Sequence, residues 1–181
     1  MAKAGTVAAR SNNARDPAWL ALARRKIGTR EAPGPANNPT ILGWAKRLGN
    51  RVLGILYNAD DVPWCGVFVA YCLDEAGIAA PLLAVRAKSW ATWGSTIRPE
   101  RLAPGAVLVF EREGGGHVGF YVGEDGTHYH VLGGNQDDAV SVARIPKSRL
   151  IASRWPRGAA VIGGPVRLSE RAGIPVSRNE A

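Results

Sequence analysis

The spacing of apolar residues changes once along this chain, and this change limits the possible folds more than any other feature. Residues 16–27, 38–48 and 63–76 place apolar side chains at the three- and four-residue spacing of helices, and Gly follows each segment. From residue 106 to residue 155, apolar residues instead alternate with polar ones in short segments, which are separated by turns containing Gly or Asp. Helices that come first and strands that follow predict an α+β fold with a largely antiparallel sheet.

The length of 181 residues suits one domain. We expect this domain to span residues 16–156, between a basic, disordered segment at residues 1–15 and a basic, flexible tail at residues 157–181 that is rich in Gly, Pro and Arg. No apolar run approaches the roughly 18 residues that a membrane span needs, so we expect no transmembrane segment. We also expect a monomer.

Basic residues are concentrated at the two ends of the chain. Residues 1–30 carry seven Lys or Arg and one acidic residue, and residues 144–181 carry eight and two. The segment between them carries eight basic and twelve acidic residues, a formal charge of −4. Basic ends are attracted to an anionic bacterial envelope, but ordinary solvated tails have the same composition. The basic stripe with interleaved aromatic residues that is typical of nucleic-acid binding is missing, so we expect no nucleic acid as a partner.

The chain has two cysteines, Cys65 and Cys72. On one helix their Cα atoms would lie roughly 10.5 Å apart, beyond the limit of about 7 Å for a disulfide, so we expect two free thiols. Cys65 falls in the first turn of the helix predicted from Pro63, where unpaired N–H groups and the helix dipole favour a thiolate. We therefore expect the pKa of Cys65 to lie below the value of about 8.5 for a free thiol. The alternative role, a small buried apolar residue, fits Cys72.

His117 begins a predicted strand and follows three glycines, at positions 114–116. Small residues at this point let a substrate backbone approach closely, which makes Gly116 a candidate binding residue. A cysteine at a helix start and a histidine at a strand start, far apart in sequence, are typical of the nucleophile and base of a thiol hydrolase. A single histidine can equally be a hydrogen-bonded structural residue.

The role of Asn135 depends on the register of one hairpin. If residues 124–126 form a three-residue loop with Gly126 in the left-handed conformation, partner numbers add to about 250. His117 and Asn135 then share a face of the sheet, and Asn135 could fix the tautomer of the imidazole. With a two-residue turn the numbers add to 251, and Asn135 faces away unless a bulge intervenes.

Two further histidines, His128 and His130, share a strand face and could bind zinc together with His117 or Cys65. The register that adds to 250 puts them on the face opposite His117, and the sequence lacks the ligand spacings typical of zinc sites. We therefore expect no metal, and surface exposure is the simpler explanation for both residues.

Four segments of the chain occur in a characteristic order. They are the D-x-x-W-C-G-x-F-V pattern around Cys65, the strand PGAVLVFE, the segment GHVGFYVG that contains His117, and LGGNQ about eighteen residues later. Together they resemble the NlpC-type and CHAP amidohydrolase/peptidase superfamily of peptidoglycan hydrolases, over residues 16–156. The resemblance implies a papain-like fold, in which N-terminal helices pack on the sheet and the nucleophile lies at a helix N-terminus.

The resemblance also implies roles for individual residues. Cys65 becomes the nucleophile, His117 the general base and Asn135 the polar third member. Some CHAP relatives carry a glutamate two positions before the asparagine, but this chain has Gly133 there, which leaves Asn135 as the candidate. The proposed reaction is acyl transfer through a thioester, with the backbone N–H of Cys65 in the oxyanion hole, and it needs no metal or organic cofactor.

Two residues beside the nucleophile are further candidates for substrate binding. Asp61 could bind a substrate amide, although a helix cap is its more frequent role. Trp64 could form the floor of the cleft, although tryptophan packs more often in the core.

The resemblance implies peptidoglycan as the partner and an amide bond of the stem peptides as the substrate. The start of the sequence lacks the apolar stretch of a secretory signal, so action on the wall or in the periplasm would fit a phage lysin or an exported effector made in the bacterial cytoplasm. Two alternatives remain: a thiol acyltransferase or protein deamidase that uses the same residues, and a non-catalytic wall-binding or virion-associated protein.

Overall fold

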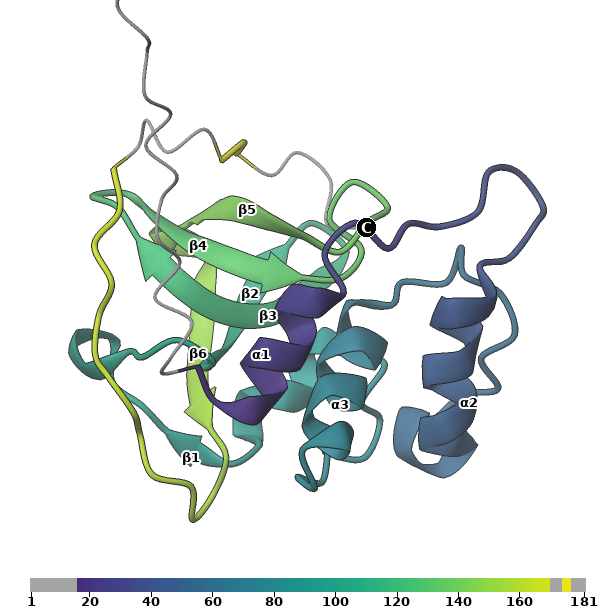
Figure 1. Cartoon of the computed structure of the whole chain (residues 1–181), viewed down its shortest axis with the longest axis horizontal. Helices are drawn as coiled ribbons and strands as arrows, with labels where there is room; N and C mark the ends of the chain where they lie inside the picture. The colour runs from purple at the N-terminus through teal and green to yellow at the C-terminus, as the bar shows by residue number, and fades with distance from the viewer. Residues whose placement is uncertain (1–15, 170–173, 177–181) are drawn as a thin grey trace, which may run out of the picture.

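The computed structural model describes residues 16–169 and 174–176, in which three helices lie against one antiparallel sheet (Figure 1). Helix α3 lies between α1 and α2, and the strand order is β1-β6-β2-β3-β4-β5. The predicted α+β fold with a papain-like arrangement is confirmed. The elements are α1 (Ala18–Arg25), α2 (Pro39–Leu53), α3 (Cys65–Glu75), η2 (Ala87–Thr92), β1 (Ser95–Thr96), η3 (Pro99–Arg101), β2 (Val107–Arg112), β3 (Gly115–Glu124), β4 (His128–Gly133), β5 (Ser141–Pro146), η4 (Lys147–Arg149) and β6 (Leu150–Trp155).

The first two helices begin near the predicted positions but differ in detail. Asn38 caps α2, because its side chain accepts the Thr40 N–H at 2.7 Å. Gly49 does not end this helix as predicted: it adopts a φ of 76° inside it, and the chain continues helically beyond this kink. Asp16 does not cap α1, because its carboxylate instead pairs with Arg24 at 2.6 Å.

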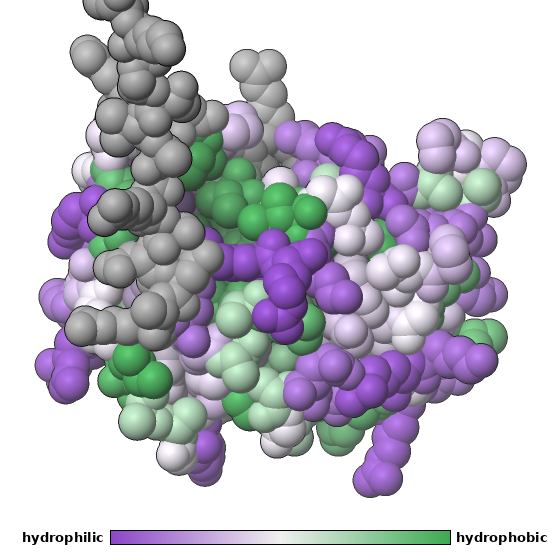
Figure 2. Space-filling view, in the orientation of Figure 1, coloured by the Kyte–Doolittle hydropathy of each residue, from purple (hydrophilic) through white to green (hydrophobic). Residues whose placement is uncertain are grey.

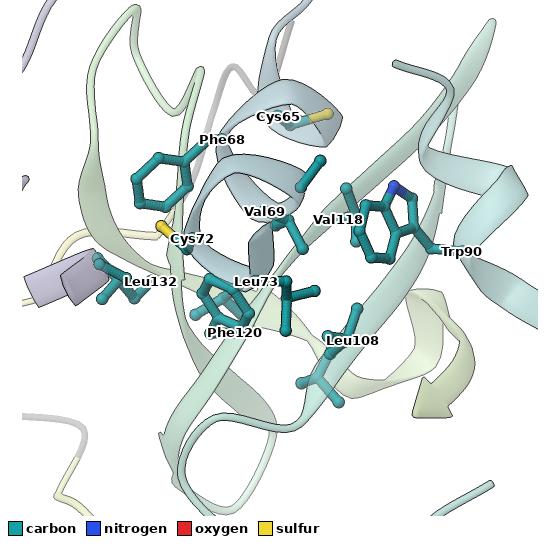
Figure 3. Close-up of a cluster of buried hydrophobic side chains, with 14 of the residues drawn as sticks. Cys65, Phe68, Val69, Cys72, Leu73, Trp90, Leu108, Val118, Phe120 and Leu132 are labelled. Carbon is teal, nitrogen blue, oxygen red and sulfur yellow. The ribbon is translucent and has the colours of Figure 1, made fainter. Parts of the chain in front are cut away.

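Helix α3 is the buried centre of the fold, as its apolar sequence predicts. On the sheet side, the ring of Phe68 lies 6.3 Å from that of Phe120, and on the other side it lies 5.6 Å from Trp44. Figure 3 shows Val69 and Leu73 of the helix directed toward the sheet. Because both sides of α3 are packed, its first residue is held in a fixed place relative to the strands.

The β3–β4 hairpin has a register that differs from both predictions. Tyr121 pairs with Val131, so partner numbers add to 252, and after a bulge Gly123 pairs with His130, so they add to 253. Because 252 has the same parity as 250, the residues before the bulge keep the faces that the first alternative predicted.

The hairpin turn explains this difference. The Asp125 carboxylate accepts the N–H groups of Thr127 and His128, both at 2.9 Å, and these bonds shape a longer loop than expected. Gly126, predicted to be left-handed, is not among the described residues with positive φ.

The described part of the segment after β6 runs along the sheet (Figure 1), and the flexible tail at residues 157–181 stays a prediction. Glu124 donates its N–H to Val166 and accepts one from Leu168, both at 2.8 Å, and Arg144 donates its N–H to Pro175 at 3.0 Å. These bonds satisfy backbone groups at the end of β3 and along β5. The same hydrogen bonds attach the described part of residues 157–181 to the sheet. The predictions for residues 1–15 lie outside the described residues.

The face seen in Figure 1 has a mixed surface. Figure 2 shows hydrophilic side chains over the lower end of α2 and between α1 and α3, with smaller hydrophobic areas among them. Within the described ranges, none of the helices combines the length and the apolar character that crossing a membrane requires.

Candidate active site

Cys65 is the first residue of α3, as the sequence predicts, and only 3% of its surface is exposed. Figure 3 shows its sulfur at the outer end of the helix, on the side of Val118 and Trp90, whereas the Cys72 sulfur lies deep in the apolar cluster. In the described part of the chain no side chain caps α3, so the predicted capping role of Asp61 is wrong, and Asp61 is exposed. The N–H groups of the first helical turn therefore remain available to the thiol.

Opposing electrostatic effects act on the pKa of the Cys65 thiol. Burial raises the pKa of the thiol, whereas the backbone N–H groups of Val118 and Gly66 and the charge of Arg112 lower it, and burial is the largest of these effects. The net direction is upward, so our prediction of a lowered pKa is wrong. A thiol of this kind needs a neighbouring base to remove its proton.

His117 lies in β3, opposite Phe110 of β2, and is completely buried. Its Nε2 lies 3.0 Å from Oε1 of Gln136. The Gln136 amide nitrogen donates to the carbonyl oxygens of Val131 and Ser141, at 3.2 and 2.7 Å, so its Oε1 must face the imidazole as an acceptor. Nε2 of the neutral ring therefore carries the proton, and Nδ1 carries the lone pair that a general base requires.

The structure brings the start of α3 to the start of β3. The backbone N–H of Val118, the residue directly after His117, lies close enough to the Cys65 sulfur to lower the pKa of the thiol. Since successive Cα atoms are only about 3.8 Å apart, this contact places the sulfur beside the strand position that carries the imidazole.

Gln136 is a site residue that the sequence analysis missed. Asn135, which we had singled out, is buried and adopts a φ of 57°, a left-handed conformation that asparagine tolerates. The LGGNQ segment contains both carboxamides, and only the conformation of this turn decides which of them meets Nε2 of His117. The role of Asn135 stays a prediction.

Gly133, which stands where some CHAP relatives carry glutamate, has no room for a side chain. A Cβ there would lie 2.6 Å from Oε1 of Gln136 and 3.1 Å from Nε2 of His117. The glycine therefore preserves the hydrogen bond between these two residues.

Trp64 belongs to the core and not to the cleft. It is completely buried, its ring lies 6.1 Å from that of Trp44, and its Nε1 donates to Oε1 of Glu31 at 2.6 Å. Burial raises the pKa of Glu31, and the hydrogen bond from Trp64 opposes that rise. Trp64 therefore packs in the core beneath the start of α3 and does not line the pocket.

A pocket of about 390 Å³ opens at Cys65. Gly116 lines it, and a Cβ at this position would lie 3.0 Å from the carbonyl oxygen of Phe110, so only glycine fits without displacing the strand. The other lining residues are three cationic side chains and a group of small or apolar ones, namely Arg86, Lys88, Arg112, Ile55, Val62, Pro63, Val85, Ala87, Gly114 and Gly115.

The remaining two histidines lie at the turn end of the β3–β4 hairpin, around a buried carboxylate. Asp125 Oδ2 lies 2.8 Å from Nε2 of His130 and 2.7 Å from Nε of Arg144, and His128 donates its backbone N–H to the same carboxylate. Although burial raises the pKa of Asp125, these hydrogen bonds, with that of Arg144 the strongest, hold it well below its usual range. Within the described residues, no group of three or more His, Cys, Asp or Glu is arranged to hold a metal ion.

Comparison with models of known protein families places part of this chain in a family. Residues 57–135 match the family model of the CHAP domain, which confirms the family that the four sequence segments indicated. The match includes both Cys65 and His117. No curated protein matches the chain.

Proposed function

We propose that this chain, whose residues 57–135 belong to the CHAP family, hydrolyses an amide bond in the stem peptides of peptidoglycan. CHAP domains are typically hydrolases acting on peptidoglycan. The observation that carries the proposal is the proximity of the Val118 N–H to the Cys65 thiol, which supports pairing the cysteine at the start of α3 with His117, the residue before Val118.

The proposed reaction begins with proton transfer from the Cys65 thiol to Nδ1 of His117. The thiolate attacks the amide carbonyl, and the N–H groups of Cys65 and Gly66 at the start of α3 stabilise the oxyanion. The C–N bond breaks, the leaving amine takes the proton from the imidazolium, and a thioester remains. His117 then takes a proton from water, which hydrolyses the thioester and releases the acid and the thiol.

Gln136 has the orienting role in this proposal. Its Oε1 holds Nε2 of His117, so the imidazole presents Nδ1 as a base, and the two bonds from its amide nitrogen fix the carboxamide itself. A neutral carboxamide at this position orients the ring without adding a negative charge that would stabilise the imidazolium.

Replacing Cys65 with Ala tests the proposal on purified cell walls. We expect this variant to release no soluble wall peptides, while Cys72→Ala, which removes the same group two turns along the same helix, stays active. Mass spectrometry of the products must show new peptide termini, since a deamidase would change side chains by about one mass unit instead. Undiminished release by Cys65→Ala would remove this cysteine from the mechanism.

A further inference from the structure

Arg112 is a cationic residue of the pocket whose role the mechanism does not explain. It is the last residue of β2 and pairs with Gly115 across the turn to β3. Its Nε is buried, and within the part of the chain that the structure describes, this nitrogen finds no hydrogen-bond acceptor and the guanidinium forms no ion pair. A buried donor without an acceptor costs about 1–3 kcal/mol, so its presence in a folded protein calls for a partner.

The charged residues that the structure describes around the pocket provide no carboxylate for Arg112. Lys88, on the same pocket, already has a partner, because its Nζ lies 2.7 Å from Oε1 of Glu111. Of the described residues that line the pocket, none is acidic, and three are cationic. The charge of Arg112 also acts on the Cys65 thiol, so the guanidinium lies within electrostatic range of the reacting sulfur.

We infer that Arg112 binds a carboxylate on the acyl part of the substrate, so that the enzyme prefers amide bonds flanked by a free carboxylate. This inference rests on the proposed function and names its substrate class. A guanidinium can hold a carboxylate through two parallel hydrogen bonds, and such a ligand would supply the acceptor that Arg112 lacks. Gly114, Gly115 and Gly116 form the adjoining wall, where the absence of side chains lets a peptide backbone reach the thiol.

The test compares one wall preparation in two chemical forms. Purified peptidoglycan with free stem-peptide carboxylates is used as it is, or after conversion of these carboxylates to amides with a carbodiimide and ammonia. We measure kcat/KM for release of soluble peptides by the wild type, Arg112→Gln and Arg101→Gln. Arg101 is an exposed cation in a different groove, so its variant loses the same formal charge away from the thiol.

We expect the wild type and Arg101→Gln to prefer the carboxylate form by roughly 10- to 100-fold. Arg112→Gln should lose this preference, mainly through slower cleavage of the carboxylate form. A loss of thiolate stabilisation alone would slow both forms equally, so an unchanged ratio between the two walls in Arg112→Gln would overturn the inference. So would equal cleavage of both forms by the wild type.

A binding measurement separates this inference from the proposed function. Cys65→Ala protein, with and without Arg112→Gln, is titrated calorimetrically with a soluble muropeptide before and after amidation. The amide form should bind roughly 10- to 100-fold more weakly when Arg112 is present, and equally when it is absent. Tight, Arg112-dependent binding together with an inactive wild type would refute the hydrolase and keep the carboxylate site. Binding that ignores amidation would refute the carboxylate site whatever the activity.

Discussion

Replacing Gln136 with Ala tests how the imidazole is oriented. His117 Nε2 and Gln136 Oε1 lie 3.0 Å apart, and both side chains are buried. A buried N–H that loses its acceptor costs about 1–3 kcal/mol. If this cost falls on the tautomer that acts as a base, kcat/KM should fall by roughly 5- to 150-fold.

The same replacement removes two structural hydrogen bonds. The Gln136 amide nitrogen donates to the carbonyl oxygens of Val131 and Ser141. At about 0.5–1.5 kcal/mol each, these bonds together contribute about 1–3 kcal/mol to the free energy of unfolding. The melting temperature should therefore fall together with activity, and kinetics must be measured well below it.

The assay compares Gln136→Ala with Asn135→Gly in the release of soluble peptides from purified walls. Glycine suits the positive φ of position 135, so this control removes the neighbouring carboxamide without straining the turn. Gln136→Glu adds a third comparison, because a carboxylate would stabilise the imidazolium and move the acid limb of the pH profile to higher pH. The reasoning is refuted if Gln136→Ala keeps at least half of the wild-type kcat/KM while Asn135→Gly loses most of it.

Three further predictions follow from the geometry. Alkylation of Cys65 by iodoacetamide should accelerate with a midpoint above about pH 8.5, because burial raises the pKa of this thiol, and a midpoint below pH 7 would contradict the structure. Gly133→Ala should lower kcat/KM at least about 10-fold, because its Cβ would lie 3.1 Å from Nε2 of His117; wild-type kinetics would show that the turn adjusts freely. Asp125→Asn should lower the free energy of unfolding by about 3–5 kcal/mol at pH 7, because it removes the carboxylate that pairs with Arg144, whose side chain is only 12% exposed; urea unfolding measures this change. The folded-state pKa of Asp125 is depressed, so its contribution is present above the unfolded value of 3.8 and is lost as pH falls below it; the variant should lack this acid dependence.

The parts of the site that depend on local pattern were predictable from the sequence. Cys65 at a helix start follows from the apolar segment after Pro63, and His117 on a strand follows from the alternation of apolar residues after three glycines. These features are set by the spacing of residues close together in the chain, which sequence displays directly.

The parts that depend on distant contacts were not predictable. The direction of the Cys65 pKa depends on how completely the sheet and η2 cover the thiol, a property of the packed molecule. The hairpin register depends on the hydrogen bonds that the Asp125 side chain accepts within the turn. The sequence alone does not distinguish this turn from one in which Gly126 adopts the left-handed conformation. The choice between Asn135 and Gln136 is a matter of one residue, and the conformation of a single turn decides it.

The bonds from the segment after β6 have a consequence for solubility. Strand β5 ends the sheet, and an unprotected outermost strand can recruit strands from other molecules. Pro175 accepts the Arg144 N–H on that outer side, and Arg167 forms an ion pair with Glu124 at 2.8 Å, so this stretch shields the sheet margin from self-association. Shortened versions that stop at Pro156 should keep the pocket but aggregate at concentrations where the longer chain stays dispersed.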